Sequence, residues 1–310
     1  MLNITDFSFL SSDGATSLHA RQWQDTERAP LAVLQITHGV SEYIARYDDF
    51  ARFLTENSFV VVGHDHLGHG LSLPQGGTPI FFSEEDGWNK AVDDVYGLHR
   101  IIKERWPDLP CFLMGHSMGS FIARTFLIRY PGSVDGAVIM GTGWQNPAIL
   151  AGGLLVAALE CRRRGCRSTS DMVTNLAFGS YNKAFAPNRT GSDWLSVNEE
   201  NVDRYIADPM CGQDATVGLF RDMLRGFRFN QTAENLHKMD QNTPVFFISG
   251  LNDPVGEMGK GVERSAKAFR DAGMRRVDMA LFPGLRHEVL NESCRDDVYR
   301  KLLQWMKQYI

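Results

Sequence analysis

The stretch CFLMGHSMGSFIARTFLIRY, residues 111–130, joins a short apolar run to a helical pattern through the pentapeptide GHSMG. A strand, a sharp turn and a helix in this order expose a serine at the turn, here Ser117. Gly115 and Gly119 suit such a turn, since side chains on either side of Ser117 would clash. The stretch therefore predicts a nucleophilic serine, and the alternative is a plain strand-to-helix turn capped by a serine.

Working outward, apolar runs alternate with helical stretches along most of the chain. Continuous apolar runs of this length are typical of parallel strands that are buried on both faces. The runs lie at residues 31–39, 59–65, 111–117, 136–142, 244–250 and 277–284. Residues 47–58 and 88–106 have apolar positions at the spacing of a helix, and residues 7–23 are typical of an antiparallel edge hairpin. The pattern predicts an α/β fold, with a mostly parallel sheet flanked by helices.

One interval breaks the alternation. Residues 144–241 contain no run that is typical of a core strand, and their pattern is mostly helical. Because a structureless loop of this length is improbable in a compact domain, we expect an inserted helical cap, or lid. The predicted organisation is a core formed by residues 1–143 and 242–310, with the cap at residues 144–241.

A serine needs a base, and the base needs an orienting group. In an elbow of this kind an acid and then a histidine should follow, each just past a later strand. Asp253 follows the run PVFFISG, and His287 follows the run VDMALFPG. Taken singly, Asp253 could instead form an Asx-turn before Pro254, and His287 could be a loop residue without a special role.

With these residues in place, the chain resembles the α/β-hydrolase fold serine hydrolases, in particular the monoacylglycerol lipase and lysophospholipase-like group, whose hydrolase domain is of the serine aminopeptidase S33 type. The resemblance spans the whole predicted core and leaves out the cap. It rests on the stretches ITHGVSEYIARY (36–47), GHDHLGHGLS (63–72), GHSMGS (115–120), GLNDPVGE (250–257) and PGLRHEVLNE (283–292).

The resemblance implies a role for each of the candidate residues. Ser117 is the expected nucleophile, Asp253 the orienting acid and His287 the general base. The His38–Gly39 pair falls on the family's His-Gly loop, which implies that the backbone N–H groups of Val40 and Met118 form the oxyanion hole. Two departures leave the contacts near that hole open: Tyr43 replaces a frequent histidine, and Ser120 replaces a usual third glycine.

GHDHLGHGLS also raises the question of a metal site, because His64, His66 and His69 are close in sequence. A metallo-β-lactamase type of site would have Asp where Gly68 stands, and no matching set of further ligands follows downstream. In the resembling family this stretch shapes a tight loop beside the elbow. We therefore expect the histidines to form structural hydrogen bonds, and we expect no metal and no cofactor.

Composition limits the partners and the location. The formal net charge of −5 gives no electrostatic reason to bind nucleic acid. The N-terminal residues lack the pattern of a secretory signal, and the longest apolar stretch, residues 148–160, is too short to cross a bilayer. The five cysteines form no C-x-x-C pair, so reduced thiols in a cytoplasmic protein are expected.

The substrate implied by the resemblance is a carboxylic ester, with monoacylglycerol or lysophospholipid favoured and small esters of a general carboxylesterase as an alternative. The first part of the cap, residues 148–167, has an apolar run followed by Arg162, Arg163, Arg164 and Arg167. This segment either offers a wall to an acyl chain and basic residues to an anionic head group or membrane surface, or is an ordinary packed helix with a solvated end.

Two other functions remain open. A serine peptidase of the proline-iminopeptidase type would share the fold and the triad, and it would need acidic cap residues to hold an amino terminus. The candidates are Glu199, Glu200, Asp203 and Asp208. A catalytically inactive member that serves in binding is the other alternative, against which the intact set of Ser117, Asp253 and His287 argues.

Overall fold

The computed structural model describes all 310 residues and has one eight-stranded sheet in the order β1-β2-β4-β3-β5-β6-β7-β8. Pairing is antiparallel at β1·β2 and β2·β4 and parallel across the rest of the sheet. The strands are β1 (Leu2–Leu10), β2 (Ser17–Asp25), β3 (Ala32–Thr37), β4 (Phe59–His64), β5 (Cys111–His116), β6 (Gly136–Met140), β7 (Val245–Gly250) and β8 (Val277–Phe282). Each predicted strand is therefore confirmed, and so is the edge hairpin.

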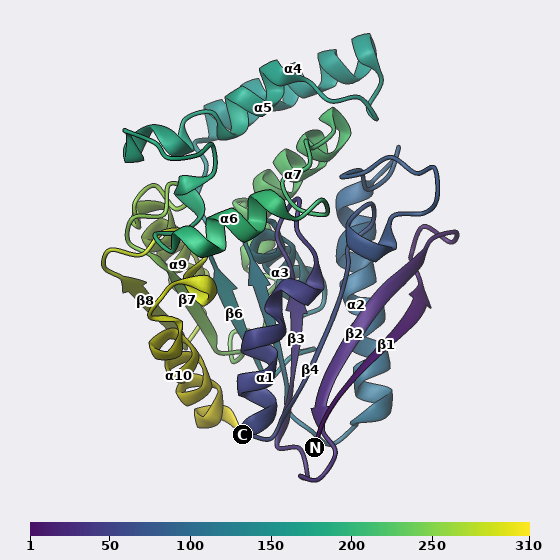
Figure 1. The fold of residues 1–310 in the computed structure, drawn as a ribbon, viewed down its shortest axis with the longest axis vertical. Helices are drawn as coiled ribbons and strands as arrows, with labels where there is room; N and C mark the ends of the chain where they lie inside the picture. Colours follow the sequence, from purple (N-terminus) through teal and green to yellow (C-terminus); the bar gives the residue numbers. More distant parts are fainter.

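Helices cover both faces of this sheet, as Figure 1 shows. The core helices are α1 (Asp48–Glu56), α2 (Gly87–Arg105), α3 (Met118–Arg129), α9 (Lys260–Asp271) and α10 (Arg295–Met306). Side chains alternate along β5, since Phe112 and Met114 pack with α1 and α10 while Leu113 packs with α2, α3 and α9. A continuous apolar strand thus supplies two cores at once, which is why these runs show no polar alternation.

The strand β8 differs from this pattern. We expected it to be buried on both faces, yet Asp278 and Met279 are exposed. It lies at the edge of the sheet, beyond β7, so that its outer side has no strand partner. An apolar run alone does not distinguish an edge strand from a central one.

Between β6 and β7 the chain forms helices and no strand of the sheet. These helices are α4 (Pro147–Arg164), α5 (Asp171–Phe178), α6 (Glu199–Ala207), α7 (Val217–Asn230) and α8 (Ala233–Leu236). Short 3₁₀ turns lie at Ile44–Tyr47, Gly70–Ser72, Tyr181–Phe185, Asp193–Leu195, Val289–Asn291 and Lys307–Tyr309. Helices α4 to α7 gather at one end of the molecule, opposite both termini (Figure 1). None of the helices combines the length and the apolar character that crossing a membrane requires.

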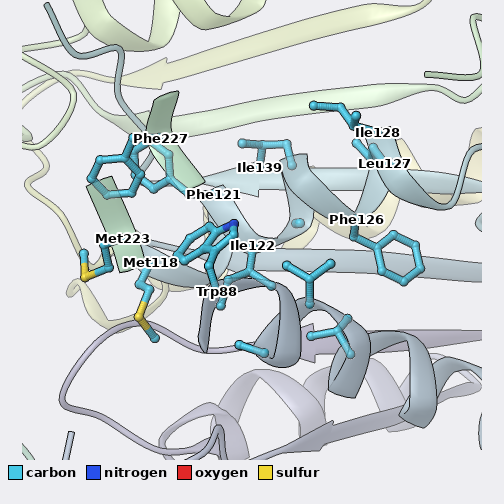
Figure 2. Close-up of a cluster of buried hydrophobic side chains, with 14 of the residues drawn as sticks. Trp88, Met118, Phe121, Ile122, Phe126, Leu127, Ile128, Ile139, Met223 and Phe227 are labelled. Atoms are coloured by element: carbon cyan, nitrogen blue, oxygen red, sulfur yellow. The ribbon is translucent and has the colours of Figure 1, made fainter. Parts of the chain in front are cut away.

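The beginnings of two of these helices follow from their sequences. Asn146 caps α4 by accepting the Ala148 N–H at 2.8 Å, and Pro147 occupies the first turn, where no N–H is needed. Thr216 caps α7 by accepting the Leu219 N–H at 3.2 Å. Helix α7 then packs its Met223 and Phe227 beside Phe121, as Figure 2 shows.

The state of two cysteines differs from the expected reduced thiols. Cys161 and Cys166 form a disulfide, so the prediction of reduced thiols is wrong for this pair. Cys161 lies in the last turn of α4, and the chain turns back after that helix, which brings the two Cα atoms to 4.3 Å. Spacing alone does not give this pairing, because it depends on the direction in which the chain leaves the helix. The other cysteines, Cys111, Cys211 and Cys294, are free.

Candidate active site

Ser117 stands between β5 and α3 with a φ of 52° and a ψ of −122°. A positive φ is costly for a residue with a side chain, and such strain gathers at functional sites. A Cβ on Gly115 would lie 2.2 Å from the Gly119 oxygen, and a Cβ on Gly119 would lie 2.1 Å from the Thr37 oxygen. Only glycine fits on either side of this turn, which is the physical reason for the G-x-S-x-G spacing.

The register of the sheet brings the candidate loops to one edge. Thr37 of β3 pairs with Gly115 of β5, and His116 of β5 pairs with Met140 of β6. The Ser117 N–H donates to the Met140 oxygen at 3.0 Å, which fastens the turn to the neighbouring strand. Since these strands are parallel, their carboxyl ends meet at the same edge, where ligands of α/β sheets bind.

Asp253 and His287 are brought together by the loops after β7 and β8. Their Oδ2 and Nδ1 atoms lie 2.9 Å apart, and both side chains are buried. Asp253 Oδ2 also accepts from the Ser249 hydroxyl, and its Oδ1 accepts the Val255 N–H, each at 2.9 Å. The last bond is an Asx-turn, so Asp253 makes the contact that each interpretation requires, with a different carboxylate oxygen for each.

The protonation of this carboxyl follows from its surroundings. Burial by itself would raise the pKa of Asp253. The charge and hydrogen bond of His287, with the donors Ser249 and Val255, outweigh burial and hold that pKa below its ordinary value. Asp253 is thus an anion at neutral pH, suited to orient the imidazole of His287.

Ser117 and His287 line one cavity of about 550 Å³, which Val40 and Met118 also line. His287 Nε2 makes no hydrogen bond within the protein. The rings of Trp194 and His116 lie with their centroids 5.1 and 4.8 Å from that of His287. The predicted nucleophile, base and oxyanion-hole residues therefore share one cavity, with Asp253 behind the base.

The loop that carries Val40 packs closely on the elbow. A Cβ on Gly39 would lie 3.1 Å from Ser117 Cβ. The Gly39 N–H donates to Glu42 Oε1 at 2.6 Å, which fixes the loop, while the Val40 N–H has no acceptor in the protein. Met118 is the first residue of α3, where helix N–H groups lack intrahelical partners. Both N–H groups are therefore free to donate to a ligand beside Ser117.

A buried ionic network behind this loop was not predicted. Arg46 donates to Glu42 at 2.7 Å and binds both carboxylate oxygens of Glu288 at 2.8 Å. Glu42 Oε1 also accepts from the Tyr47 hydroxyl at 2.9 Å and lies 3.1 Å from Nδ1 of His116. The network joins the Gly39 loop to the residues beside Ser117 and His287.

The charges in this network shift the pKa values of its members. Burial alone would raise the pKa of Glu42, yet His116 and Arg46 hold that pKa well below its ordinary value. Burial would lower the pKa of His116, and the Glu42 carboxylate raises it. The only sequence signal is Glu42 four residues before Arg46, which is the spacing of a helical ion pair.

The stretch GHDHLGHGLS forms a buried loop held by Asp65. Its carboxylate accepts the N–H groups of Ile44 and Leu71 at 2.7 and 2.9 Å. His66 bonds to the Thr37 hydroxyl at 2.8 Å, whereas His64 makes no hydrogen bond with either ring nitrogen. No three His, Cys, Asp or Glu side chains are arranged as metal ligands. The expected hydrogen bonds are present at His66 and at His69, whose Nδ1 lies 2.9 Å from the Leu67 oxygen, and are absent at His64, a buried, neutral ring, with burial lowering its pKa to about 3.

The cap supplies much of the cavity wall. Helix α4 contributes Leu150, Gly153 and Val156, whereas Leu154 and Leu155 do not line the cavity. The wall is continued by side chains of the other cap helices, among them Val173, Leu176, Phe178, Phe220, Met223, Leu224 and Phe227. The cavity is apolar and closed mainly by cap residues, which suits a long acyl chain.

The four arginines of the predicted basic segment lie outside this cavity. Arg163 and Arg164 pair with Glu160, and Arg167 pairs with Glu84. Arg162 forms no ion pair. These residues are therefore not placed to bind a head group inside the cavity.

Comparison with known proteins agrees with this architecture. The model of the family described as serine aminopeptidase, S33, matches residues 28–294. The monoacylglycerol lipase of Mycolicibacterium smegmatis is 27% identical over 313 residues, spanning 99% of this chain and 98% of that protein. The monoglyceride lipase of Homo sapiens is 30% identical over 205 residues, a match that spans 66% of this chain and only 60% of the human protein.

Among solved structures, a thermostable carboxyl esterase from Bacillus coagulans, crystallised with glycerol, superposes with a TM-score of 0.92 at 26% identity. That match covers 99% of this chain and 98% of the esterase. The expected resemblance to the monoacylglycerol lipase group is confirmed. The chain belongs to the serine aminopeptidase, S33, family of hydrolases and has the α/β-hydrolase fold.

Proposed function

We propose that this protein is a serine hydrolase that cleaves carboxylic esters with a long acyl chain and a small uncharged head group, monoacylglycerol foremost. The observation that carries the proposal is the hydrogen-bonded pair of Asp253 and His287 on the apolar cavity that Ser117 also lines. Sequence similarity to monoacylglycerol lipase along nearly the full chain supports it.

The mechanism follows from the positions of these groups. Ser117 Oγ attacks the ester carbonyl while His287 Nε2 takes the hydroxyl proton, and Asp253 stabilises the imidazolium that forms. The Val40 and Met118 N–H groups hold the oxyanion. His287 then returns the proton to the departing alcohol, which leaves an acyl group on Ser117. Water attacks this acyl-enzyme by the same route, with His287 as base, and releases the fatty acid.

The charges of the cavity favour an uncharged head group over an anionic one. No lysine or arginine lines the cavity, and its acidic lining residues are Glu42, Asp214 and Glu288. Arg46 forms ion pairs with both Glu42 and Glu288, which still leaves an excess of negative charge there, while Asp214 is exposed. An anionic head group would therefore meet no counter-ion, and its desolvation would be uncompensated. This argues for acylglycerols, with zwitterionic lysophospholipids next and anionic lysophospholipids last.

The peptidase alternative gains no support from the cap. Glu199, Glu200 and Asp203 have exposed side chains, and none of them lines the cavity. Asp208 accepts a hydrogen bond from the Tyr43 hydroxyl at 2.7 Å and is also outside the cavity lining. No acidic cap residue predicted from the sequence is positioned to bind a substrate's amino terminus beside Ser117.

We also propose that the outer face of α4 and α5 meets a lipid surface. Large apolar side chains are exposed there, namely Ile149, Leu155, Leu159, Met172 and Leu176. Ile149 and Leu176 also line the cavity, so this apolar face is continuous with the substrate site. A peripheral contact of this kind suits a lipid that must leave a membrane or micelle to react.

A substrate panel tests the proposed function. We expect monooleoylglycerol to be hydrolysed faster than oleoyl-lysophosphatidylcholine, and oleoyl-lysophosphatidic acid slowest, with no release from aminoacyl-arylamides. Ser117→Ala and His287→Ala should each lower turnover by about 10⁴-fold or more, and the double variant should be little worse, because the triad acts as a unit. Ser117→Ala activity within tenfold of wild type, or failure of a fluorophosphonate to label the wild type, contradicts the proposal.

A further inference from the structure

Arg124 of α3 is completely buried and has no acidic partner. Its guanidinium donates to the Gly143 carbonyl at 2.9 Å, to the Thr142 hydroxyl at 3.3 Å and to the Asn230 carbonyl at 3.5 Å. It also lies 5.3 to 6.0 Å from three ring centroids, those of Phe121, Trp144 and Phe269. An unpaired buried cation is costly, so carbonyl dipoles and aromatic faces must compensate it here.

The groups that Arg124 contacts lie where the chain passes between the sheet and the cap. Thr142 and Gly143 follow β6, on the segment that leads into α4, and Asn230 is the last residue of α7, on the segment that returns. These two segments, the crossings between the sheet and the cap, also bind each other. The Gln145 N–H donates to Gln231 Oε1 at 2.8 Å, and Gln231 Nε2 donates to the Gln145 carbonyl at 2.7 Å.

Other residues of α3 strengthen the hold on the returning crossing. The Thr125 hydroxyl donates to Asn230 Oδ1 at 2.8 Å, and Asn230 Nδ2 donates to the Phe121 carbonyl at 2.7 Å. The ring of Phe121 lies 4.0 Å, centroid to centroid, from the ring of Phe227 on α7 (Figure 2). The helix that begins directly after Ser117 is thus one of the elements that support the cap, and it holds the returning crossing.

The contacts between α3 and the two crossings extend to the substrate cavity. Gln145, Phe121 and Phe227 all line that cavity. A change in how α3 holds the crossings would therefore move the cavity wall relative to Ser117, while the elbow, Asp253 and His287 would stay in place on the sheet.

We propose that Arg124 is a positioning residue that sets the placement of the cap over Ser117 and so determines how well long acyl chains are bound. This inference rests on the proposed function, in which Ser117 is the nucleophile. Arginine suits the task because its planar fork donates to several acceptors at once, and here it binds both crossings from one position. A lysine ammonium also has three donors, but they diverge from a single nitrogen and do not span both crossings as the guanidinium does, and a methionine side chain has no donor at all.

The test compares Arg124→Met and Arg124→Lys with a matched control, Arg129→Met, on the same helix. Arg129 forms its ion pair with Asp93, in contact with neither crossing. The substrates are p-nitrophenyl acetate and p-nitrophenyl decanoate, and fluorophosphonate titration gives the concentration of active sites. We expect Arg124→Met to raise KM for decanoate about tenfold, a factor that corresponds to about 1.4 kcal/mol, and to leave kcat for acetate within about twofold. Arg124→Lys should recover part of the loss, and Arg129→Met should lose nothing.

Equal losses on both substrates, or an unchanged ratio of decanoate to acetate kcat/KM in a fully titrating Arg124→Met, overturn the proposal. Should that variant fail to fold, Gln231→Met breaks the pairing of the crossings and leaves Arg124 intact. This variant loses two neutral hydrogen bonds, so it should lower the decanoate to acetate ratio at least threefold, and an unchanged ratio again overturns the proposal.

A last measurement separates this inference from the proposed function. Hydrogen exchange of the amides in residues 143–146 and 228–232 needs no substrate, and it should be faster in Arg124→Met than in Arg129→Met. If the wild type hydrolyses no ester and is not labelled, the proposed function fails, while exchange still decides whether Arg124 holds the crossings. Equal exchange in the two variants would show that Arg124 does not hold the crossings.

Discussion

Val156 is the residue of α4 at which the acyl-chain wall can be tested most directly. Its side chain is half-buried and lines the cavity, whereas its neighbour Leu155 is 62% exposed and does not line it. Replacing each with aspartate places the same charge on the same helix, one residue apart. Val156→Asp puts the carboxylate into the wall, and Leu155→Asp puts it into solvent.

The expected magnitudes follow from the burial of the chain. A buried methylene contributes about 0.8 kcal/mol, so kcat/KM should rise about fourfold per added CH₂ until the cavity is filled. A polar group without a partner in the wall costs about 1–3 kcal/mol. Val156→Asp should therefore lower kcat/KM for chains that reach it by roughly 5- to 150-fold. Hydrolysis of acetate should stay within about threefold, since a two-carbon acyl group contacts little of the wall.

The assay is kcat/KM for a series of p-nitrophenyl esters, from acetate to dodecanoate, below their critical micelle concentrations so that surface binding plays no part. Thermal unfolding and fluorophosphonate titration establish that both variants fold. Leu155→Asp should keep the wild-type dependence on chain length. The reasoning is refuted if folded Val156→Asp and Leu155→Asp show the same profile, because α4 would then close the site without contacting the chain.

Four further predictions follow from other parts of the molecule. EDTA should leave turnover unchanged and the purified protein should hold no stoichiometric zinc, and activity that is lost on chelation and restored by metal would contradict this. Burial lowers the pKa of His64 from 6.5 to about 3. The unfolded chain therefore binds a proton that the folded chain does not, and stability is lost as the pH falls below 6.5. Between pH 7 and pH 5 the free energy of unfolding should decrease by about 2 kcal/mol less in His64→Phe than in the wild type, as measured by urea titration, and an equal decrease would contradict this. Glu42→Gln should lower kcat more than it raises KM and destabilise the fold by about 1–3 kcal/mol, because Arg46 and the Gly39 N–H lose a charged acceptor. An unchanged kcat would show that Glu42 does not support the Gly39 loop. Leu159→Asp should weaken binding to phosphatidylcholine vesicles and leave hydrolysis of dissolved esters intact, whereas equal vesicle binding would exclude α4 from the lipid contact.

The residues at the strand ends could be predicted because their determinants are local. Gly115 and Gly119 are required by backbone contacts within the turn, and the order of Ser117, Asp253 and His287 follows from the order of the strands. The same locality explains why the strands themselves were placed correctly. A short apolar run between turn residues, too short for a helix, favours a strand, although β8 shows that it does not establish burial.

The residues that the sequence did not reveal depend on contacts between distant segments. Arg46 and Glu288 are 242 positions apart, and nothing in either neighbourhood indicates that they meet. An apolar wall on α4 was one of two interpretations of its sequence, and the orientation of the helix could not be predicted, because residues 147–159 are apolar or small on every side of the helix. Periodicity gives no direction when no polar face exists. The cytoplasmic location and the boundaries of the cap stay predictions.

Helix α3 combines a locally determined turn with contacts between distant segments. It begins at the residue after Ser117, and Arg124 lies seven residues beyond that serine, roughly 10 Å along the helix axis. A single rigid helix therefore begins next to the proposed nucleophile and holds the crossings to the cap two turns later. Because a helix this short bends little, the distance between the reacting serine and the wall of the cavity is set by side-chain contacts at the two crossings. Substitutions there can change which chains are bound while the strand ends keep the reacting groups in place, so substrate preference in this protein should respond to residues that never touch the substrate.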